Sequence, residues 1–154
     1  MSKKYELTNE TKTNNGVVLH RIRALRYIPR FGVKAGDLGG WIEKEENLLH
    51  AGDAWVSGDA VVFGDAEVFG DAKVYGNAKV YGDADYMTFK NSWSSGRWFT
   101  YTRSNKMWTV GCFHGTGEEL IKKAYVDSEL SGRCYETVVK AVEQIEAAKT
   151  DFGF

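Results

Sequence analysis

The sequence has few of the residues on which several protein classes depend. Its 154 residues include two cysteines, Cys112 and Cys134, and three histidines. Two isolated cysteines cannot form the disulfide framework of a small secreted protein, and a single histidine near the repeat cannot supply a zinc site on adjacent strands. No apolar run reaches the roughly 18 residues of a membrane-spanning helix, and the N-terminal segment MSKKYELTNETK is too polar for a secretory signal. We therefore expect a cytoplasmic chain with reduced cysteines, no metal and no cofactor.

Glycine, in contrast, is abundant, and much of it belongs to a six-residue repeat between Gly52 and Ala84. Each repeat reads Gly, then Asp or Asn, then Ala, with Val two residues after the Ala. Gly accepts a positive φ and Asp or Asn tolerates the left-handed region, so the pair marks a corner, while Val and Ala point to one side of an extended segment. A fixed period this short predicts a solenoid. The expected fold class is mainly β, with a short left-handed parallel β-helix over residues 40–87.

The segments on either side of the repeat are expected to cover its ends, because a short solenoid needs capping. Residues 1–39 predict a basic β-ribbon that turns at Asn14–Gly16, and residues 88–154 predict an α+β cap. The expected elements of this cap are three strands and two helices, at Asp85–Lys90, Arg97–Thr102, Met107–Cys112, Gly117–Val126 and Arg133–Lys149. The first helix is indicated by the capping box from Thr116 to Glu119.

Charge is unevenly distributed along the chain, although its formal net charge is only −1. Residues 1–34 carry eight Lys or Arg against two acids, a net of +6, whereas residues 35–87 carry three against eleven, a net of −8. We expect the basic N-terminal ribbon to pair with the acidic corners of the repeat. The alternative is a basic ribbon that binds phosphate or an acidic protein.

Two sets of side chains are not needed to build the repeat and are therefore candidates for binding a partner. The acidic set consists of Asp53, Asp59, Asp65 and Asp71. The outward aromatic set consists of Phe63, Phe69, Tyr75 and Tyr81. The aspartates favour corner formation, but they could also mimic the phosphates of DNA. The aromatic set predicts an exposed apolar patch that either the caps or a second copy must cover, which favours a homo-oligomer, most simply a dimer or trimer.

A third set of candidates follows the repeat, where basic and aromatic residues alternate. It consists of Lys90, Arg97, Trp98, Tyr101 and Arg103. Such a mixture on a sheet can stack on and clamp a nucleotide, although a hydrophobic cap with solvated basic edges remains the preferred interpretation.

One resemblance covers most of the chain. The segments HRIRALRYI and VKAGDLGGWIEKEENL, the hexads that follow them and a GCFHGT motif at residues 111–116 resemble a family of small phage and prophage hexapeptide-repeat proteins of the polymer-forming-like type. The resemblance implies a β-helix, a phage origin and hence the cytoplasm of an infected bacterium. It implies no activity.

These observations predict a binding protein and not an enzyme. The primary hypothesis is a counter-defence inhibitor of the anti-CRISPR type. It would contact a host CRISPR effector or nuclease through the acidic or aromatic set, without binding nucleic acid directly. A sponge for a nucleotide immune signal is the first alternative. A hexapeptide-type acyltransferase and a structural assembly protein are the others, and none of the three histidines lies in a recognisable acyltransferase motif.

Overall fold

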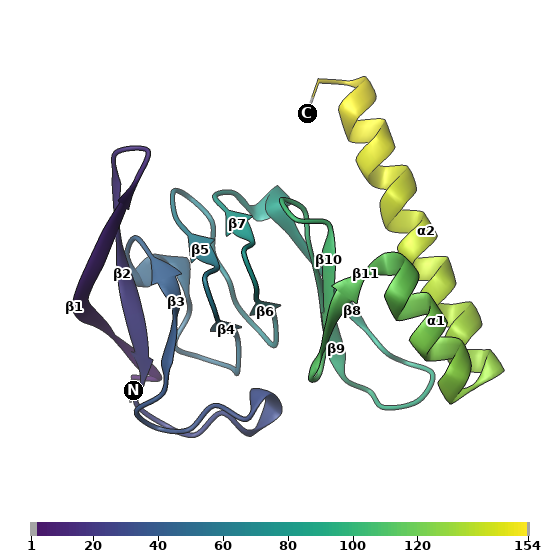
Figure 1. Cartoon of the computed structure of the whole chain (residues 1–154), viewed down its shortest axis with the longest axis horizontal. Helices are drawn as coiled ribbons and strands as arrows, with labels where there is room; N and C mark the ends of the chain where they lie inside the picture. The colour runs from purple at the N-terminus through teal and green to yellow at the C-terminus, as the bar shows by residue number, and fades with distance from the viewer. Residues whose placement is uncertain (1–2, 154) are drawn as a thin grey trace.

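The computed structural model describes residues 3–153, apart from the side chain of residue 83. Its elements follow one another along the long axis of the molecule (Figure 1). A hairpin of β1 (Tyr5–Asn14) and β2 (Val17–Ala24) lies at one end, and the repeat occupies the middle. An antiparallel sheet and two helices form the other end.

The hairpin turns where the sequence predicts it. Asn15 and Gly16 have φ values of 50° and 83°, the positive angles that a tight hairpin turn requires at both central residues. The predicted turn at Asn14–Gly16 is therefore confirmed. β2 continues the sheet by pairing antiparallel with β3 (Leu38–Ile42), through contacts such as Arg21 with Trp41.

The strands of the repeat are only two residues long. β5 (Val61–Val62) and β7 (Lys79–Val80) extend the first sheet in parallel register, giving the order β1-β2-β3-β5-β7. β4 (Trp55–Val56) and β6 (Lys73–Val74) form a separate two-stranded parallel sheet. Within each parallel pair of repeat strands the partners are three hexads apart: Trp55 faces Lys73, and Val61 faces Lys79.

The predicted fold class, a short left-handed parallel β-helix with two caps, is wrong. The described residues form several small sheets: a mixed five-stranded sheet, a parallel two-stranded sheet and an antiparallel four-stranded sheet. A corner at every sixth residue keeps each repeat strand to two residues, and β3 pairs on its other edge with an antiparallel strand. The repeat therefore specifies the register between short strands, but not the architecture around them.

The first five corners of the repeat are built as the Gly-Asp pattern predicts, whereas Gly82 at the sixth has an extended φ of −154°. Five glycines, one per hexad, have φ between 65° and 76°: Gly52, Gly58, Gly64, Gly70 and Gly76. This is the left-handed region, which residues with a Cβ rarely adopt. Each glycine therefore permits the change of direction that separates one short strand from the next.

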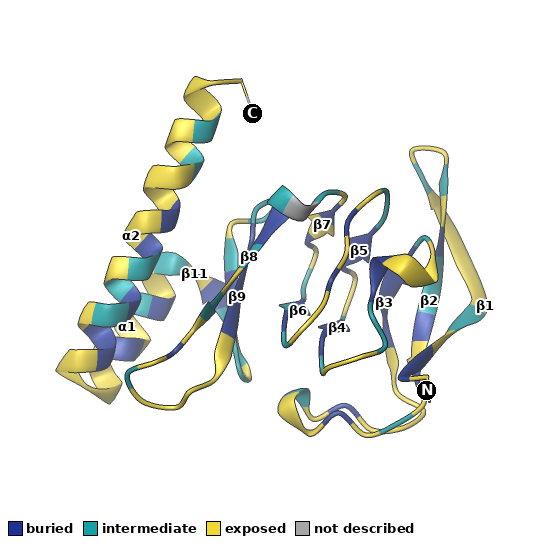
Figure 2. Cartoon of the chain, turned by 180° about the vertical axis from the view of Figure 1, so that it is seen from behind, coloured by how far each residue is buried: buried dark blue, intermediate teal, exposed yellow. Residues whose placement is uncertain are grey.

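The chain buries two main apolar clusters (Figure 2). The first lies within the repeat and the hairpin, where the repeated Val and Ala side chains from Ala54 to Val80 are at most 1% exposed and pack with residues such as Tyr5, Ile22 and Ile42. The second joins the antiparallel sheet to the helices through Phe99, Trp108 and other side chains. The antiparallel part is thus anchored by its own core.

The antiparallel sheet has the order β11-β10-β9-β8. Its strands are β8 (Tyr86–Lys90), β9 (Trp98–Thr102), β10 (Met107–Val110) and β11 (Phe113–Thr116). The first three occupy the predicted segments. The fourth was not predicted, and it forms from the GCFHGT motif.

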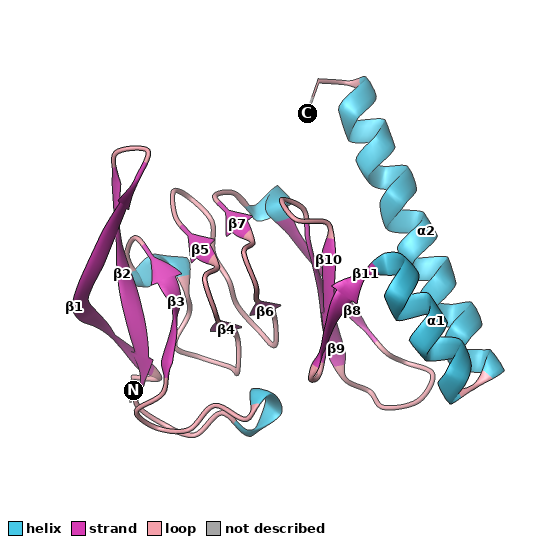
Figure 3. Cartoon of the chain, viewed as in Figure 1, coloured by secondary structure: helices cyan, strands magenta, loops and turns pink. Residues whose placement is uncertain are grey.

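Two helices follow the antiparallel sheet (Figure 3), and the predicted start is confirmed for the first and wrong for the second. α1 (Gly117–Asp127) begins as expected, because the Glu119 amide donates to Thr116 Oγ1 at 3.2 Å and the Thr116 amide donates to the Glu119 carboxylate at 2.8 Å. α2 (Glu129–Asp151) begins four residues before the predicted start, because Ser128 Oγ accepts from the Ser131 amide at 3.0 Å. A single residue therefore separates the helices.

The loop between β2 and β3 extends away from the hairpin end of the molecule and returns to it. It carries the short 3-10 helix Pro29–Phe31 and runs beneath the repeat toward the antiparallel sheet (Figure 1). Arg30, Phe31 and Gly32 of this loop line a cavity.

Candidate functional site

A cavity of about 380 Å³ lies where the Pro29–Phe31 loop, the repeat and the antiparallel sheet meet. Three of its lining side chains are cationic: Arg30, Lys73 and Arg97. Four carry rings: Phe31, Tyr75, Phe113 and His114. No carboxylate is among the described residues that line it. A cavity with several cations, several rings and no acid is suited to a planar anion.

Lys73 lies on β6 and extends between two aromatic rings. Its Nζ is 5.3 Å from the centre of the Phe31 ring and 4.8 Å from that of the Tyr75 ring. Partial burial lowers the pKa of this amine, and the nearby Cys112 side chain opposes that shift. Within residues 3–153, no carboxylate lies within ion-pair distance of the Lys73 ammonium. Its charge is therefore stabilised by ring faces and is open to an added anion.

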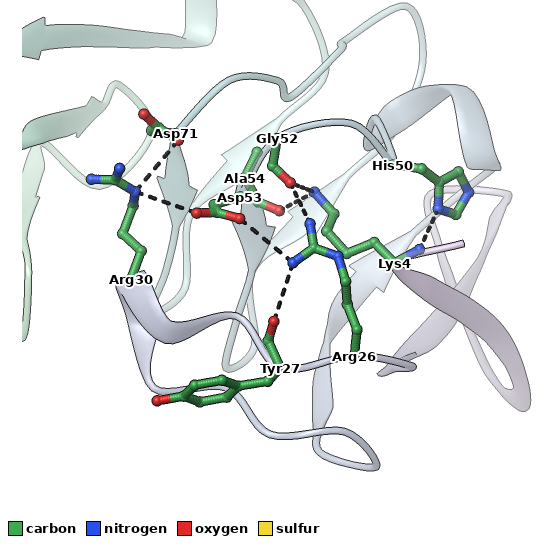
Figure 4. A network of polar contacts seen from close by, with 9 residues as sticks. All are labelled: Lys4, Arg26, Tyr27, Arg30, His50, Gly52, Asp53, Ala54 and Asp71. Carbon is green, nitrogen blue, oxygen red and sulfur yellow. Dashed lines mark hydrogen bonds and ion pairs between the residues drawn. The ribbon is translucent and has the colours of Figure 1, made fainter. Parts of the chain in front are cut away.

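The two arginines at the cavity differ in how their charge is balanced. Arg30 Nε lies 3.7 Å from an Asp53 carboxylate oxygen and 3.4 Å from an Asp71 carboxylate oxygen (Figure 4). Arg97 is exposed, precedes β9, and forms no ion pair with any described residue. Arg30 is thus held in the wall by two carboxylates, whereas the charge of Arg97 is not balanced by an ion pair with any described residue.

His114 closes the cavity next to Tyr75. The two rings meet edge to face with centroids 4.6 Å apart, and His114 Nδ1 lies 3.2 Å from Thr109 Oγ1. Burial and the positive charge of Lys73 lower the pKa of His114, so the imidazole is neutral at physiological pH. It can therefore hydrogen-bond a ligand without adding a third unbalanced charge.

The acidic set of the repeat is divided between internal ion pairs and the surface. Asp53 is shared by Arg26, at 3.6 Å, and Arg30, and Asp71 also contacts Arg30 (Figure 4). This confirms the expectation that the basic N-terminal part pairs with the acidic repeat. Asp59 and Asp65 remain exposed.

The aromatic set is likewise divided. Tyr75 faces the cavity, and Phe63 is half-buried with its ring centroid 5.7 Å from that of Tyr81. Phe69 and Tyr81 are 54% and 58% exposed. The antiparallel sheet therefore covers part of the patch that the sequence predicts, and two of the rings stay in solvent.

The five residues predicted to bind a nucleotide do not form one site, and Tyr101 and Arg103 line a separate cavity beside α2. Only Arg97 lines the cavity at the Pro29–Phe31 loop. Arg103 Nε lies 2.8 Å from a Glu146 carboxylate oxygen, and Tyr101 is buried, which raises its pKa to about 12. Lys90 and Trp98 face each other across β8 and β9, and both are exposed.

Several residues of the cavity were not recognised as site residues in the sequence. Arg30 and Phe31 lie in a loop, and His114 lies within the GCFHGT motif. Lys73 occupies a hexad position that elsewhere holds Trp55, Val61, Glu67 or Lys79. This position gives no local signal, because apolar, acidic and basic side chains all occupy it, and Lys79 one hexad later is exposed.

Comparison with known proteins gives no assignment: no model of a protein family matches the chain, and no curated protein does. Neither α1 nor α2 nor any other helix in the described part of the chain is long and apolar enough to cross a membrane. Residues 3–153 also contain no group of three or more His, Cys, Asp or Glu side chains placed to hold a metal ion. The candidate function therefore depends on the cavity itself.

Proposed function

We propose that this chain is a non-catalytic binding protein that sequesters a phosphate-bearing nucleotide in the cavity between the Pro29–Phe31 loop and the antiparallel sheet. The observation that carries the proposal is the cavity lining, which combines three cationic side chains and four rings with no carboxylate among the described residues. Cations balance phosphate charge, and rings or guanidinium planes stack on bases.

The state of Lys73 gives the strongest support. A partly buried ammonium without a carboxylate partner is a cost to the free protein, and an anionic ligand removes that cost. Arg97 could donate two parallel hydrogen bonds to the same phosphate. The proposal keeps the sequence-based hypothesis of a sponge for a nucleotide signal but assigns the binding to the residues that line the cavity, of which only Arg97 was among the predicted ones.

Sequestration would fit the setting that the sequence resemblance implies. A phage protein in the cytoplasm of an infected bacterium could protect the phage by lowering the free concentration of a nucleotide signal used by host defence. Such a protein needs affinity and a high copy number but no chemistry on its ligand.

A second candidate function is contact with a host defence protein, as the primary hypothesis from the sequence states. Exposed Phe69 and Tyr81 favour it, since aromatic side chains are common anchors of protein interfaces. It has less support than sequestration, because Asp53 and Asp71 are engaged by arginines of the same chain.

Calorimetric titration of the intact protein with nucleosides and with their phosphates tests the proposal. We expect saturable binding of phosphates and none of the uncharged nucleosides, and the double variant Lys73→Met/Arg97→Gln should abolish the heat signal. Equal binding of a nucleoside and its phosphate, or unchanged binding by the double variant, would overturn the assignment. Circular dichroism of the double variant checks that it is folded.

A further inference from the structure

The unbalanced charge around the cavity indicates which kind of phosphate fits it. Lys73 on β6 and Arg97 before β9 have no carboxylate partner among the described residues, whereas Arg30 is offset by Asp53 and Asp71. The wall thus presents two unbalanced positive charges. A terminal phosphate carries a charge close to −2 at neutral pH, which matches these two positive charges.

The remaining groups around Lys73 do not change this balance at neutral pH. From β11, His114 faces Lys73 as a neutral ring. The Cys112 thiol lies beyond β10, and Tyr75 on the following corner presents its ring face. Glu119, an acid near His114, has a carboxylate that accepts a hydrogen bond from the Thr116 amide at the start of α1.

We infer that the site selects a phosphomonoester dianion, as in a nucleoside 5′-monophosphate, over a phosphodiester such as a cyclic nucleotide. This inference rests on the proposed function. A diester carries one negative charge and would leave one of the two cations unbalanced at a partly enclosed site, where the effective dielectric is lower than in water. A terminal phosphate balances both, and it offers three oxygens to the Lys73 ammonium and the Arg97 fork.

The test compares the four common ribonucleoside 5′-monophosphates with their 3′,5′-cyclic counterparts by calorimetry at pH 7.5 and pH 5.0. The two nucleotides of each pair share the same base, so the ratio of their dissociation constants reports the contribution of the phosphate group to the binding free energy. At pH 7.5 we expect the monoester of the preferred base to bind about tenfold more tightly or better. Near pH 5 this ratio should shrink, because the monoester loses charge below its second pKa of about 6 while the diester does not. Protonation of His114 at low pH would favour both ligands, so it does not mimic this change.

Two variants assign the selectivity to the cavity. Lys73→Met should reduce the monoester-to-diester ratio, whereas Lys79→Met, at the same position of the next hexad, should leave the ratio unchanged. If monoester and diester bind equally well at pH 7.5, or if the diester is preferred, the inference is wrong but sequestration of nucleotides stands. If no member of either series binds at millimolar concentration, both the inference and the proposed function fail.

Discussion

Two lysines of the repeat show how the position of a residue in the fold decides its role. Lys73 and Lys79 occupy the same place in successive hexads, and both begin a two-residue strand. Lys73 extends into the cavity between Phe31 and Tyr75, while Lys79 belongs to the neighbouring sheet and is exposed. Because the two lysines share a position in the hexad but differ in their surroundings, Lys79 is a suitable control for mutations of Lys73.

Removal of the Lys73 charge should weaken nucleotide binding by about 10- to 100-fold, the usual effect of losing a hydrogen bond to a charged group. Lys73→Met replaces the ammonium beside the two rings with an uncharged side chain of similar length, so its fold should persist. Lys79→Met is the control and should bind as the unaltered protein does. A calorimetric titration in which the two variants lose affinity equally would show that the cavity is not the binding site.

Lys4 makes folding stability depend on pH in a direction that can be measured. Its side chain is fully buried, donates to the Ala54 carbonyl at 2.6 Å, and has a pKa lowered by burial to about 8, against 10.5 in a solvated lysine. Between these two values the unfolded chain binds more protons than the folded chain, so stability increases as pH rises. Urea unfolding should show a gain of about 2 kcal/mol from pH 7.5 to 9.5.

The Lys4→Met variant serves as the control for this titration, because it has no amine to deprotonate. Its unfolding free energy should rise less over the same window than that of the unaltered protein, and the remaining rise is the contribution of Lys73, whose pKa burial also lowers. The window ends below the range in which Tyr5 and Tyr101, whose pKa values are raised by burial, begin to favour the unfolded state. A stability that falls between pH 7.5 and 9.5 in the unaltered protein would contradict the role given to Lys4.

At the scale of the element, the corner glycines of the repeat differ in how much space surrounds them for an added methyl group. Both Gly52 and Gly70 have positive φ, at 76° and 67°. A Cβ at Gly70 would meet nothing within 4 Å, whereas one at Gly52 would come within 2.7 Å of the Gly70 carbonyl oxygen. The two positions therefore share the backbone strain but not the steric clash.

Gly70→Ala should destabilise the protein by about 1–2 kcal/mol, the cost of a left-handed alanine. Gly52→Ala should cost more than Gly70→Ala by at least about 1 kcal/mol, because the backbone carbonyl cannot move aside as a side chain can. Chemical denaturation of both variants gives the comparison. Equal losses, or a larger loss for Gly70→Ala, would mean that the contact between the Gly52 and Gly70 corners is not tight.

Local elements were predictable from the sequence because their causes are local. Asn15 and Gly16 form the hairpin turn by their own backbone preferences, and Thr116 caps α1 three residues before its partner Glu119. The start of α2 was missed because Ser128 caps it immediately after α1 ends. The fold class was missed because a six-residue period specifies corners and register, and not which other strands pair with the repeat.

At the scale of the whole molecule, the cavity could not be predicted because it brings together four segments that lie far apart in the chain. Arg30, Lys73, Arg97 and His114 meet only when the N-terminal loop crosses beneath the repeat and the antiparallel sheet packs beside it. Ion pairs from Asp53 and Asp71 hold that loop in place. The sequence indicated the attraction between basic and acidic segments, but not the space that it encloses.

Association of copies remains a prediction of the sequence, and the exposed rings of Phe69 and Tyr81 define where to test it. We expect light scattering to show a dimer or trimer, and the Phe69→Ser/Tyr81→Ser double variant to shift it toward the monomer. Val126→Ser, an exposed apolar position on α1, is the control and should not change the mass. A monomeric mass for the unaltered protein would refute the association.

Binding without turnover is the central claim, and recovery of the ligand tests it most directly. The intact protein is mixed with less than one equivalent of a nucleoside 5′-monophosphate, the free fraction is separated by filtration, and the protein is then denatured to release what it holds. We predict that free nucleotide is depleted in proportion to the protein and that the released nucleotide is chemically unchanged. Undiminished free nucleotide would contradict sequestration, and an altered nucleotide would contradict the absence of catalysis.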